Sequence, residues 1–220
     1  LKIEPGTTVA LVGETGAGKS TLAKLAARFH DPTSGSVLVD GHDLSDVESR
    51  SLRSQLGIVA QGPFLFSGTI ADNIAFGKPD ASREEVIHAG TLVGLDSVVE
   101  AFDTGWDSQV GERGVQLSSG QRQLVAFARA LVADPRILIL DEATANVDIN
   151  TEERIEQALE TLLGTRSAIV IAHRLSTIRR ADLVVVLEHG GIVEAGPHDE
   201  LIERGGRFAA LHRDWVQQGL

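Results

Sequence analysis

Cysteine and methionine are both absent from this sequence of 220 residues. Without cysteine the chain can form neither a disulfide bond nor a thiolate metal site, which fits a reducing compartment. Because methionine is missing even at position 1, we expect the chain to be part of a longer protein. Tyrosine is absent as well. Aromatic partners that could stack on a base are therefore scarce.

Long apolar runs and an excess of basic residues are also missing. The longest apolar runs, such as 183–187, fall well short of the roughly 18 residues that a membrane-spanning helix needs. There are 20 Lys and Arg against 31 Asp and Glu, so the formal net charge is -11. Nucleic-acid binding requires a basic face, and we therefore expect no nucleic-acid partner.

What the chain does contain is an alternation of short apolar runs with helix-like segments. A helix is expected from Lys19 to Phe29, with Leu22, Leu25 and Phe29 on its apolar face. The short runs are too brief for core helices and predict buried strands at 8–13, 137–140, 167–172 and 183–187. This order predicts an α/β fold with a mainly parallel sheet.

The middle of the sequence follows a different pattern. Between about residues 63 and 133 helical periodicity dominates, and no comparable strand is expected. We therefore predict one domain, 1–220, in which an α/β core of 1–62 and 134–220 carries a helical subdomain at 63–133. Glycine-rich residues 188–191 predict a tight hairpin turn.

The segment GETGAGKS fits the phosphate-binding pattern G-x-x-x-x-G-K-S/T between a strand and a helix. Its glycines let backbone amides wrap around phosphates. Lys19 is expected to reach the β- and γ-phosphates, and the Ser20 hydroxyl to ligate Mg²⁺. The alternative is a flexible glycine turn, which the flanking elements disfavour. The predicted ATP-binding residues are Gly13, Glu14, Thr15, Gly16, Ala17, Gly18, Lys19, Ser20 and Thr21.

Two acids follow the predicted strand at 137–140, and strand ends are where ligands bind in open α/β sheets. Asp141 suits a role in holding Mg²⁺. Glu142 is placed to act as general base on the attacking water. The alternative is a solvated pair of acids in a turn.

Gln61 and His173 each follow a strand-like segment. Taken singly, either one is an ordinary polar residue at a strand end. Because parallel strands end at the same edge of a sheet, both are expected near Lys19 and Asp141. We therefore assign Gln61 and His173 to the catalytic site with Glu142, and the Mg²⁺ site to Ser20, Gln61 and Asp141.

The stretch LSSGQRQ at 117–123 has two interpretations. Ser118 and Gln121 have the S-x-x-Q spacing of a capping box, which would start a helix. A capped helix start is also an anion site. Both interpretations can hold at once, and spacing alone does not separate them.

Together these motifs resemble, in order and over nearly the whole chain, the nucleotide-binding domain of ATP-binding cassette (ABC) transporters. The resemblance implies a P-loop NTPase (RecA-like) fold whose N-terminal antiparallel β part is truncated here. In that family two domains pair head to tail, and each ATP lies between one P-loop and the partner's signature. That signature corresponds to Ser118, Ser119, Gly120 and Gln121, and the D-loop residue to Asp148. The implied cofactors are ATP and Mg²⁺.

Segments such as PFLFSGTI, VGERG and GGIVEAGPHDEL resemble the exporter branch of the family. This implies transmembrane domains, expected in the same polypeptide, and a place on the cytosolic face of a membrane. Ser119 stands where the family has glycine, Gln109 where glutamate is usual, and 145–147 read ANV in place of SAL. These departures leave open a heterodimer with unequal sites.

Two other functions compete with export. One is a soluble ABC-type ATPase of DNA repair or translation, which the acidic charge and the exporter-like segments disfavour. The other is an ATP-sensing dimerisation module with little turnover, which Glu142 and His173 disfavour. The transported substrate cannot be read from these residues.

Overall fold

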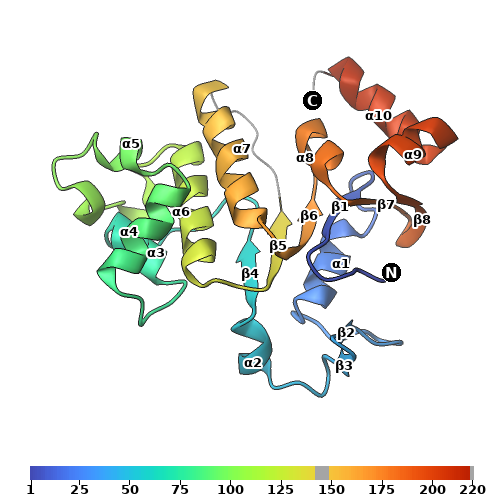
Figure 1. Cartoon of the computed structure of the whole chain (residues 1–220), viewed down its shortest axis with the longest axis horizontal. Helices are drawn as coiled ribbons and strands as arrows, with labels where there is room; N and C mark the ends of the chain where they lie inside the picture. Colours follow the sequence, from blue (N-terminus) through green and yellow to red (C-terminus); the bar gives the residue numbers. More distant parts are fainter. Residues whose placement is uncertain (142–148, 219–220) are drawn as a thin grey trace. The chain divides into compact units, whose positions relative to one another are not determined.

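The computed structural model describes residues 1–141 and 149–218 (Figure 1). Among these residues the chain forms two compact units. The first comprises 1–56, 136–141 and 165–218, and the second comprises 57–135 and 149–164. The predicted helical subdomain, 63–133, lies wholly inside the second unit. Glu142 and Asp148, together with the departures at 145–147, lie outside the described residues.

The first unit is built on a mainly parallel sheet, as the sequence predicts. In it β1 pairs in parallel with β6 and β7, β5 pairs in parallel with β6, and β8 pairs antiparallel with β7. The strands run side by side in the order β5 (Ile137–Asp141), β6 (Ser167–Ile171), β1 (Thr8–Val12), β7 (Leu183–Glu188) and β8 (Gly191–Gly196).

Both faces of the parallel strands β5, β6, β1 and β7 are buried, which explains why these strands read as continuous apolar runs rather than alternating ones. Ala10 and Val184, at the intervening positions of β1 and β7, are fully buried. On the other face the sheet packs against α1 (Lys19–Ala26). That core includes Val9, Leu11, Ile139, Ile169, Ile171, Val185 and Leu187 of the sheet and Ala23 and Ala27 of the helical segment.

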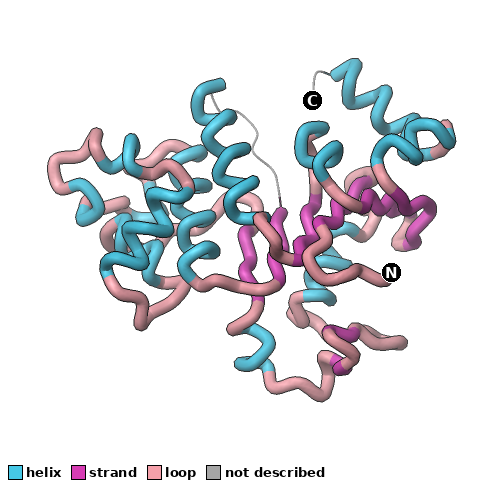
Figure 2. Tube along the Cα trace, viewed as in Figure 1, coloured by secondary structure: helices cyan, strands magenta, loops and turns pink. Residues whose placement is uncertain are grey.

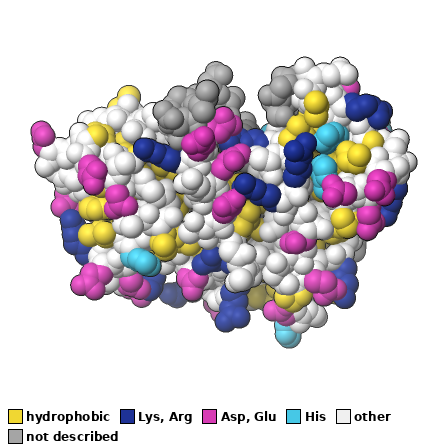
Figure 3. Space-filling model, turned by 45° about the horizontal axis from the view of Figure 1, so that its top comes forward, with side chains coloured by type: hydrophobic (Ala, Val, Ile, Leu, Met, Phe, Trp, Pro, Cys, Tyr) yellow, Lys and Arg dark blue, Asp and Glu magenta, His cyan; other side chains and the backbone are white. Residues whose placement is uncertain are grey.

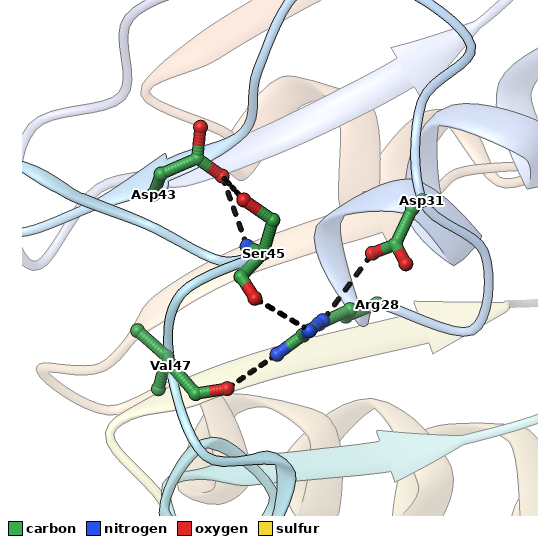
Figure 4. A network of polar contacts seen from close by, with 5 residues as sticks. All are labelled: Arg28, Asp31, Asp43, Ser45 and Val47. Carbon is green, nitrogen blue, oxygen red and sulfur yellow. Dashed lines mark hydrogen bonds and ion pairs between the residues drawn. The ribbon is translucent and has the colours of Figure 1, made fainter.

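Helix α1 is shorter than the sequence predicts. It ends at Ala26, and Phe29 is 56% exposed instead of packing on the apolar face. Arg28 has a left-handed backbone, with φ of 50°, which stops the helix. Its guanidinium donates to the carbonyl oxygens of Ser45, at 2.9 Å, and Val47 (Figure 4). The prediction failed because these tertiary contacts outweigh the local helical pattern.

The Arg28 network ties the end of α1 to the segment that follows it. Asp43 accepts hydrogen bonds from the backbone and side chain of Ser45, at 2.9 and 2.8 Å, and so shapes the loop whose carbonyls face Arg28 (Figure 4). This segment includes β2 (Leu38–Val39), paired antiparallel with β3 (His42–Asp43), and leads to α2 (Ser49–Arg53).

The second unit is mainly helical. Between 63 and 133 the chain consists of helices, turns and loops (Figure 2), with an isolated bridge between Thr69 and Gln109. Helix α6 is central and packs against α3, α4 and α7. The helices are α3 (Ile70–Ala75), α4 (Arg83–Leu92), α5 (Asp96–Val99), α6 (Ser119–Val132) and α7 (Ile149–Leu163), with 3-10 turns η1 (Gly105–Asp107) and η2 (Glu112–Gly114).

The remaining described elements are β4, the helices α8 to α10 and the turn between β7 and β8. Strand β4 (Leu56–Val59) crosses the boundary between the units. In the first unit α8 (Leu175–Arg180) follows β6, and α9 (His198–Arg204) and α10 (Arg207–Gln218) follow β8. The predicted hairpin turn joins β7 to β8, with φ of 50° at His189 and 80° at Gly190.

Two further observations concern the helices and one face of the surface. In 1–141 and 149–218 every helix is too short or too polar to cross a membrane. On the face drawn in Figure 3, Lys and Arg side chains are interspersed with Asp and Glu.

Candidate functional site

The glycine-rich segment 13–18 connects β1 to α1 as a tight loop. Gly13 has φ of 144°, and a Cβ there would lie 2.3 Å from the carbonyl oxygen of Leu187, so only glycine fits. Gly18 caps α1 in a left-handed conformation, without a side-chain cap. The first amides of α1 have no intrahelical acceptor, and the helix dipole adds positive potential at this end. The loop therefore has the geometry of an anion cradle.

Lys19 is the first residue of α1 and is only 8% exposed. Its Nζ donates to the carbonyl oxygens of Gly13, at 2.7 Å, and Glu14, at 3.0 Å. Burial lowers the pKa of Lys19, and the negative charge of Asp141 opposes that shift. An ammonium group has three protons, so these two carbonyls hold it in place and leave one proton for an anion in the cradle.

Asp141 and His173 lie close to Lys19. Asp141 ends β5, and His173 comes two residues after β6. The pKa of His173 is lowered, first by partial burial and then by the charge of Lys19, whereas Asp141 raises it. His173 is therefore neutral at pH 7, and its ring N–H can donate a hydrogen bond to an anion. The three residues meet at the carboxyl edge of the parallel strands, as the sequence predicts.

A hollow lies beside the cradle in the first unit. It is bordered by loop residues 13–17, by Leu187 and Glu188 at the end of β7, by His189 in the turn that follows, and by Arg207 at the start of α10. Sequence reasoning missed these four residues. No local sequence pattern indicates them. Arg207, for example, lies 193 positions from its ion-pair partner Glu14.

Comparison with known proteins connects this geometry to a family. The family model described as ABC transporter matches residues 1–145. The chain belongs to the ABC transporter family. Membership identifies it as a nucleotide-binding domain, and the mainly parallel α/β fold is that of this family's P-loop NTPase domains.

Two similar proteins have names that place them in the same family or describe ATP-driven lipid transport. YknV of Bacillus subtilis, named an uncharacterized ABC transporter ATP-binding protein, is 54% identical over 209 residues, which cover 95% of this chain and 35% of YknV. The ATP-dependent lipid A-core flippase of Chromobacterium violaceum is 48% identical over 212 residues, covering 96% of this chain and 36% of the flippase.

A solved structure of an ABC exporter is also similar to this chain. The ATP-bound structure of a bacterial Atm1-family ABC exporter superposes with a TM-score of 0.91 and 44% identity, covering 100% of this chain and 38% of the exporter chain. The chain thus spans about a third of the length of these three similar proteins.

The predicted signature segment, 118–121, lies at the start of helix α6 in the second unit. The predicted capping box is confirmed, since Ser118 Oγ accepts from the Gln121 amide at 3.2 Å and Gln121 Oε1 accepts from the Ser118 amide at 2.9 Å. Ser119 is the first residue of α6, is exposed, and is not among the residues with positive φ. Serine in place of the family's glycine therefore causes no backbone strain. Gly120, the next residue, is buried.

The predicted site residues are divided between the two units. Lys19, Asp141 and His173 belong to the first unit. Gln61, which is exposed two residues beyond β4, and the signature segment 118–121 belong to the second. Of the remaining predicted cradle residues, all in the first unit, Gly13 and Gly18 are half-buried and Ala17 is buried, whereas the others are exposed: Glu14, Thr15, Gly16, Ser20 and Thr21.

Proposed function

We propose that this domain binds ATP with Mg²⁺ and hydrolyses it. The observation that carries the proposal is the Lys19 ammonium, buried under the cradle and fixed by the carbonyl oxygens of Gly13 and Glu14. A buried cation held next to open amides and a helix N-terminus stabilises the charge of phosphates without rearrangement. Membership of the ABC transporter family supports the same ligand.

The donor set around the cradle suits Mg²⁺. Mg²⁺ in nucleotide sites is bound through one or two protein oxygens together with phosphate oxygens. Ser20 offers a hydroxyl on the first turn of α1, and Asp141 offers a carboxylate at the end of β5. We assign Gln61 as a further ligand on the basis of its place after β4. When bound, Mg²⁺ would neutralise charge on the β- and γ-phosphates.

Two residues are proposed to act on the attacking water and the γ-phosphate. Glu142, which directly follows Asp141, is the general base in this proposal. His173 is neutral at pH 7 and lies near Lys19, so it can hold a γ-phosphate oxygen without adding charge. Gln61 would orient the water.

A complete site also requires a partner domain in this proposal. The amides of Ser119 and Gly120, at the start of the capped helix α6, form a second anion site. We infer that this signature segment, Ser118 to Gln121, binds the γ-phosphate held by the cradle of a second, head-to-tail domain, with Asp148 at the interface. The partner is another copy of this domain or a related one.

We further propose that ATP hydrolysis drives export through transmembrane domains, with this domain on the cytosolic face of the membrane. The relatives named as a lipid A-core flippase and an Atm1-family exporter support this proposal, because each is about three times as long as the matched chain. The chemistry that selects a transported substrate would lie in those additional segments.

The Glu142→Gln variant tests the proposal. We expect ATP binding to persist and hydrolysis to be abolished, so that sizing chromatography in ATP shows a trapped dimer. The matched control is Glu153→Gln, an exposed glutamate on α7, which should leave turnover unchanged. Near-normal turnover in Glu142→Gln would remove Glu142 from its role as general base.

A further inference from the structure

We propose that Arg207, on the first turn of α10, is a positioning residue for the phosphate cradle. In this proposal, which rests on the ATPase function above, Arg207 fixes and neutralises Glu14 so that the cradle keeps its shape and its affinity for phosphate. The C-terminal helix thereby becomes part of the nucleotide site.

Arg207 bridges two acids that border the hollow beside the cradle. Its Nη2 lies 2.5 Å from Glu14 Oε1 and 3.2 Å from Glu188 Oε1. The Arg207 side chain is 35% exposed, and that of Glu14 is 70% exposed. Arg207 therefore links α10 to the P-loop and to the end of β7 through one guanidinium group.

The backbone of Arg207 is itself held firmly. The Glu194 carboxylate on β8 accepts from the amides of Arg207, at 2.7 Å, and Phe208, at 2.9 Å, and so caps the start of α10. A Cβ on Gly206 would lie 1.9 Å from Glu194 Oε1, so a side chain there would displace the carboxylate from this cap. Phe208 is fully buried. Arg207 is thus presented to the P-loop from a fixed position.

The position of Glu14 affects both Lys19 and the charge of the cradle. Its carbonyl oxygen accepts from Lys19 Nζ at 3.0 Å and from the Ala17 amide at 3.1 Å, so its backbone helps to orient the lysine. Its side chain places a negative charge on a loop that binds negative phosphates. An unpaired carboxylate there would repel the ligand, and the Arg207 charge cancels that repulsion.

The β7–β8 hairpin supports the same part of the loop from the side. The Gly190 amide donates to the carbonyl oxygen of Ala17 at 3.1 Å, and Glu188, at the end of β7, is the second partner of Arg207. The loop is therefore held by the hairpin through its backbone and by α10 through Glu14. Of these contacts, only those of Arg207 can be removed by a single side-chain change that leaves the backbone unaltered.

The test is a double-mutant cycle on Arg207 and Glu14, with affinity for a non-hydrolysable ATP analogue measured by titration calorimetry and turnover by phosphate release. We expect Arg207→Gln to raise the Kd and the KM about threefold to fivefold, with kcat changed less than about twofold, as suits a partly exposed ion pair. Arg207→Lys should recover part of the loss. In a Glu14→Gln background, Arg207→Gln should change Kd by less than about twofold, because the charge that it neutralises is gone.

Controls separate positioning from general damage to the fold. Arg204→Gln, on α9, removes an ion pair with Glu200 and should leave ATP affinity unchanged. The Arg207→Gln effect should shrink as salt is raised from about 0.1 to 1 M, since the pair is open to solvent. An equal loss of affinity in both Glu14 backgrounds would overturn the proposal, as would an unchanged Kd in Arg207→Gln. A wild-type chain that binds no nucleotide would instead overturn the proposed function.

Discussion

The Arg129 guanidinium donates two hydrogen bonds to Asn73, one to the backbone carbonyl oxygen at 2.8 Å and one to Oδ1 at 2.9 Å. It also donates to the carbonyl oxygen of Phe64 at 3.0 Å. Asn73 is 1% exposed and in turn donates to the carbonyl oxygen of Phe66. This network joins α6 to α3 and to the segment that precedes it in the second unit.

Replacing Arg129 with alanine should destabilise the second unit strongly. The change leaves carbonyl oxygens at Asn73 and Phe64 without their charged donor, at an expected cost of about 3 kcal/mol in the free energy of unfolding. Urea unfolding measures it. The control is Arg83→Ala, which breaks an ion pair with Asp107 whose side chains are both 57% exposed and should cost less than about 1 kcal/mol. Equal costs for the two variants would contradict the account of the network.

We expect the folded chain to lose stability in acid because of His212, on α10. Its Nε2 is buried and has no hydrogen-bond partner in the part of the chain that the structure describes. Burial lowers the pKa of His212, and the nearby His198 and Arg179 lower it further.

The sign of the pH dependence follows from that shift. Between the lowered folded pKa of His212 and the ordinary value of about 6.5, the unfolded chain binds more protons than the folded one. Stability is therefore retained above about pH 6.5 and lost as the pH falls through this window. We expect His212→Gln to make the decline shallower in urea unfolding at pH 7.5, 6.5 and 5.5. An unchanged slope would contradict the assignment.

Complementation between two inactive variants would test the head-to-tail arrangement. Ser118→Arg should abolish hydrolysis through the partner's site while sparing ATP binding by the monomer, and Lys19→Ala should abolish ATP binding at its own cradle. In a mixed dimer both defects fall in one composite site, so some activity should return. Absence of recovery in confirmed mixed dimers would contradict a site shared between two domains that act independently.

Discrimination between ATP and GTP should be weak in this chain. The sequence has no tyrosine, and the residues bordering the hollow beside the cradle include no phenylalanine or tryptophan. Base stacking on an aromatic side chain is worth about 1 to 3 kcal/mol in nucleic-acid sites. Without that contribution both nucleotides are held mainly through the triphosphate, which ATP and GTP share, so their calorimetric affinities should agree within about tenfold. A larger preference for ATP would reveal base contacts other than stacking on these residues.

The sequence predicted the parts of the site that are encoded by neighbouring residues. The P-loop pattern located the cradle and Lys19, and the ends of apolar runs located Asp141 and His173, because parallel strands share one edge. The S-x-x-Q spacing of Ser118 and Gln121 predicted a capping box that the structure shows atom by atom.

Features that depend on contacts between residues far apart in the sequence could not be predicted. The helix expected to reach Phe29 ends at Ala26, since carbonyl oxygens nearly twenty positions away hold Arg28 in a left-handed conformation. Arg207 meets Glu14 across 193 positions, and Arg129 meets Asn73 across 56. No periodicity or motif encodes such pairs, because only the folded chain brings them together.

The most direct measurement of the central claim is steady-state phosphate release from ATP in the presence of Mg²⁺, compared between the wild-type chain and Lys19→Ala. Because Lys19 is the buried cation of the cradle, the account predicts turnover in the wild type and none in the variant, with both chains equally folded by circular dichroism. Equal turnover in the two chains would contradict the assignment of the cradle as the ATP-hydrolysing site.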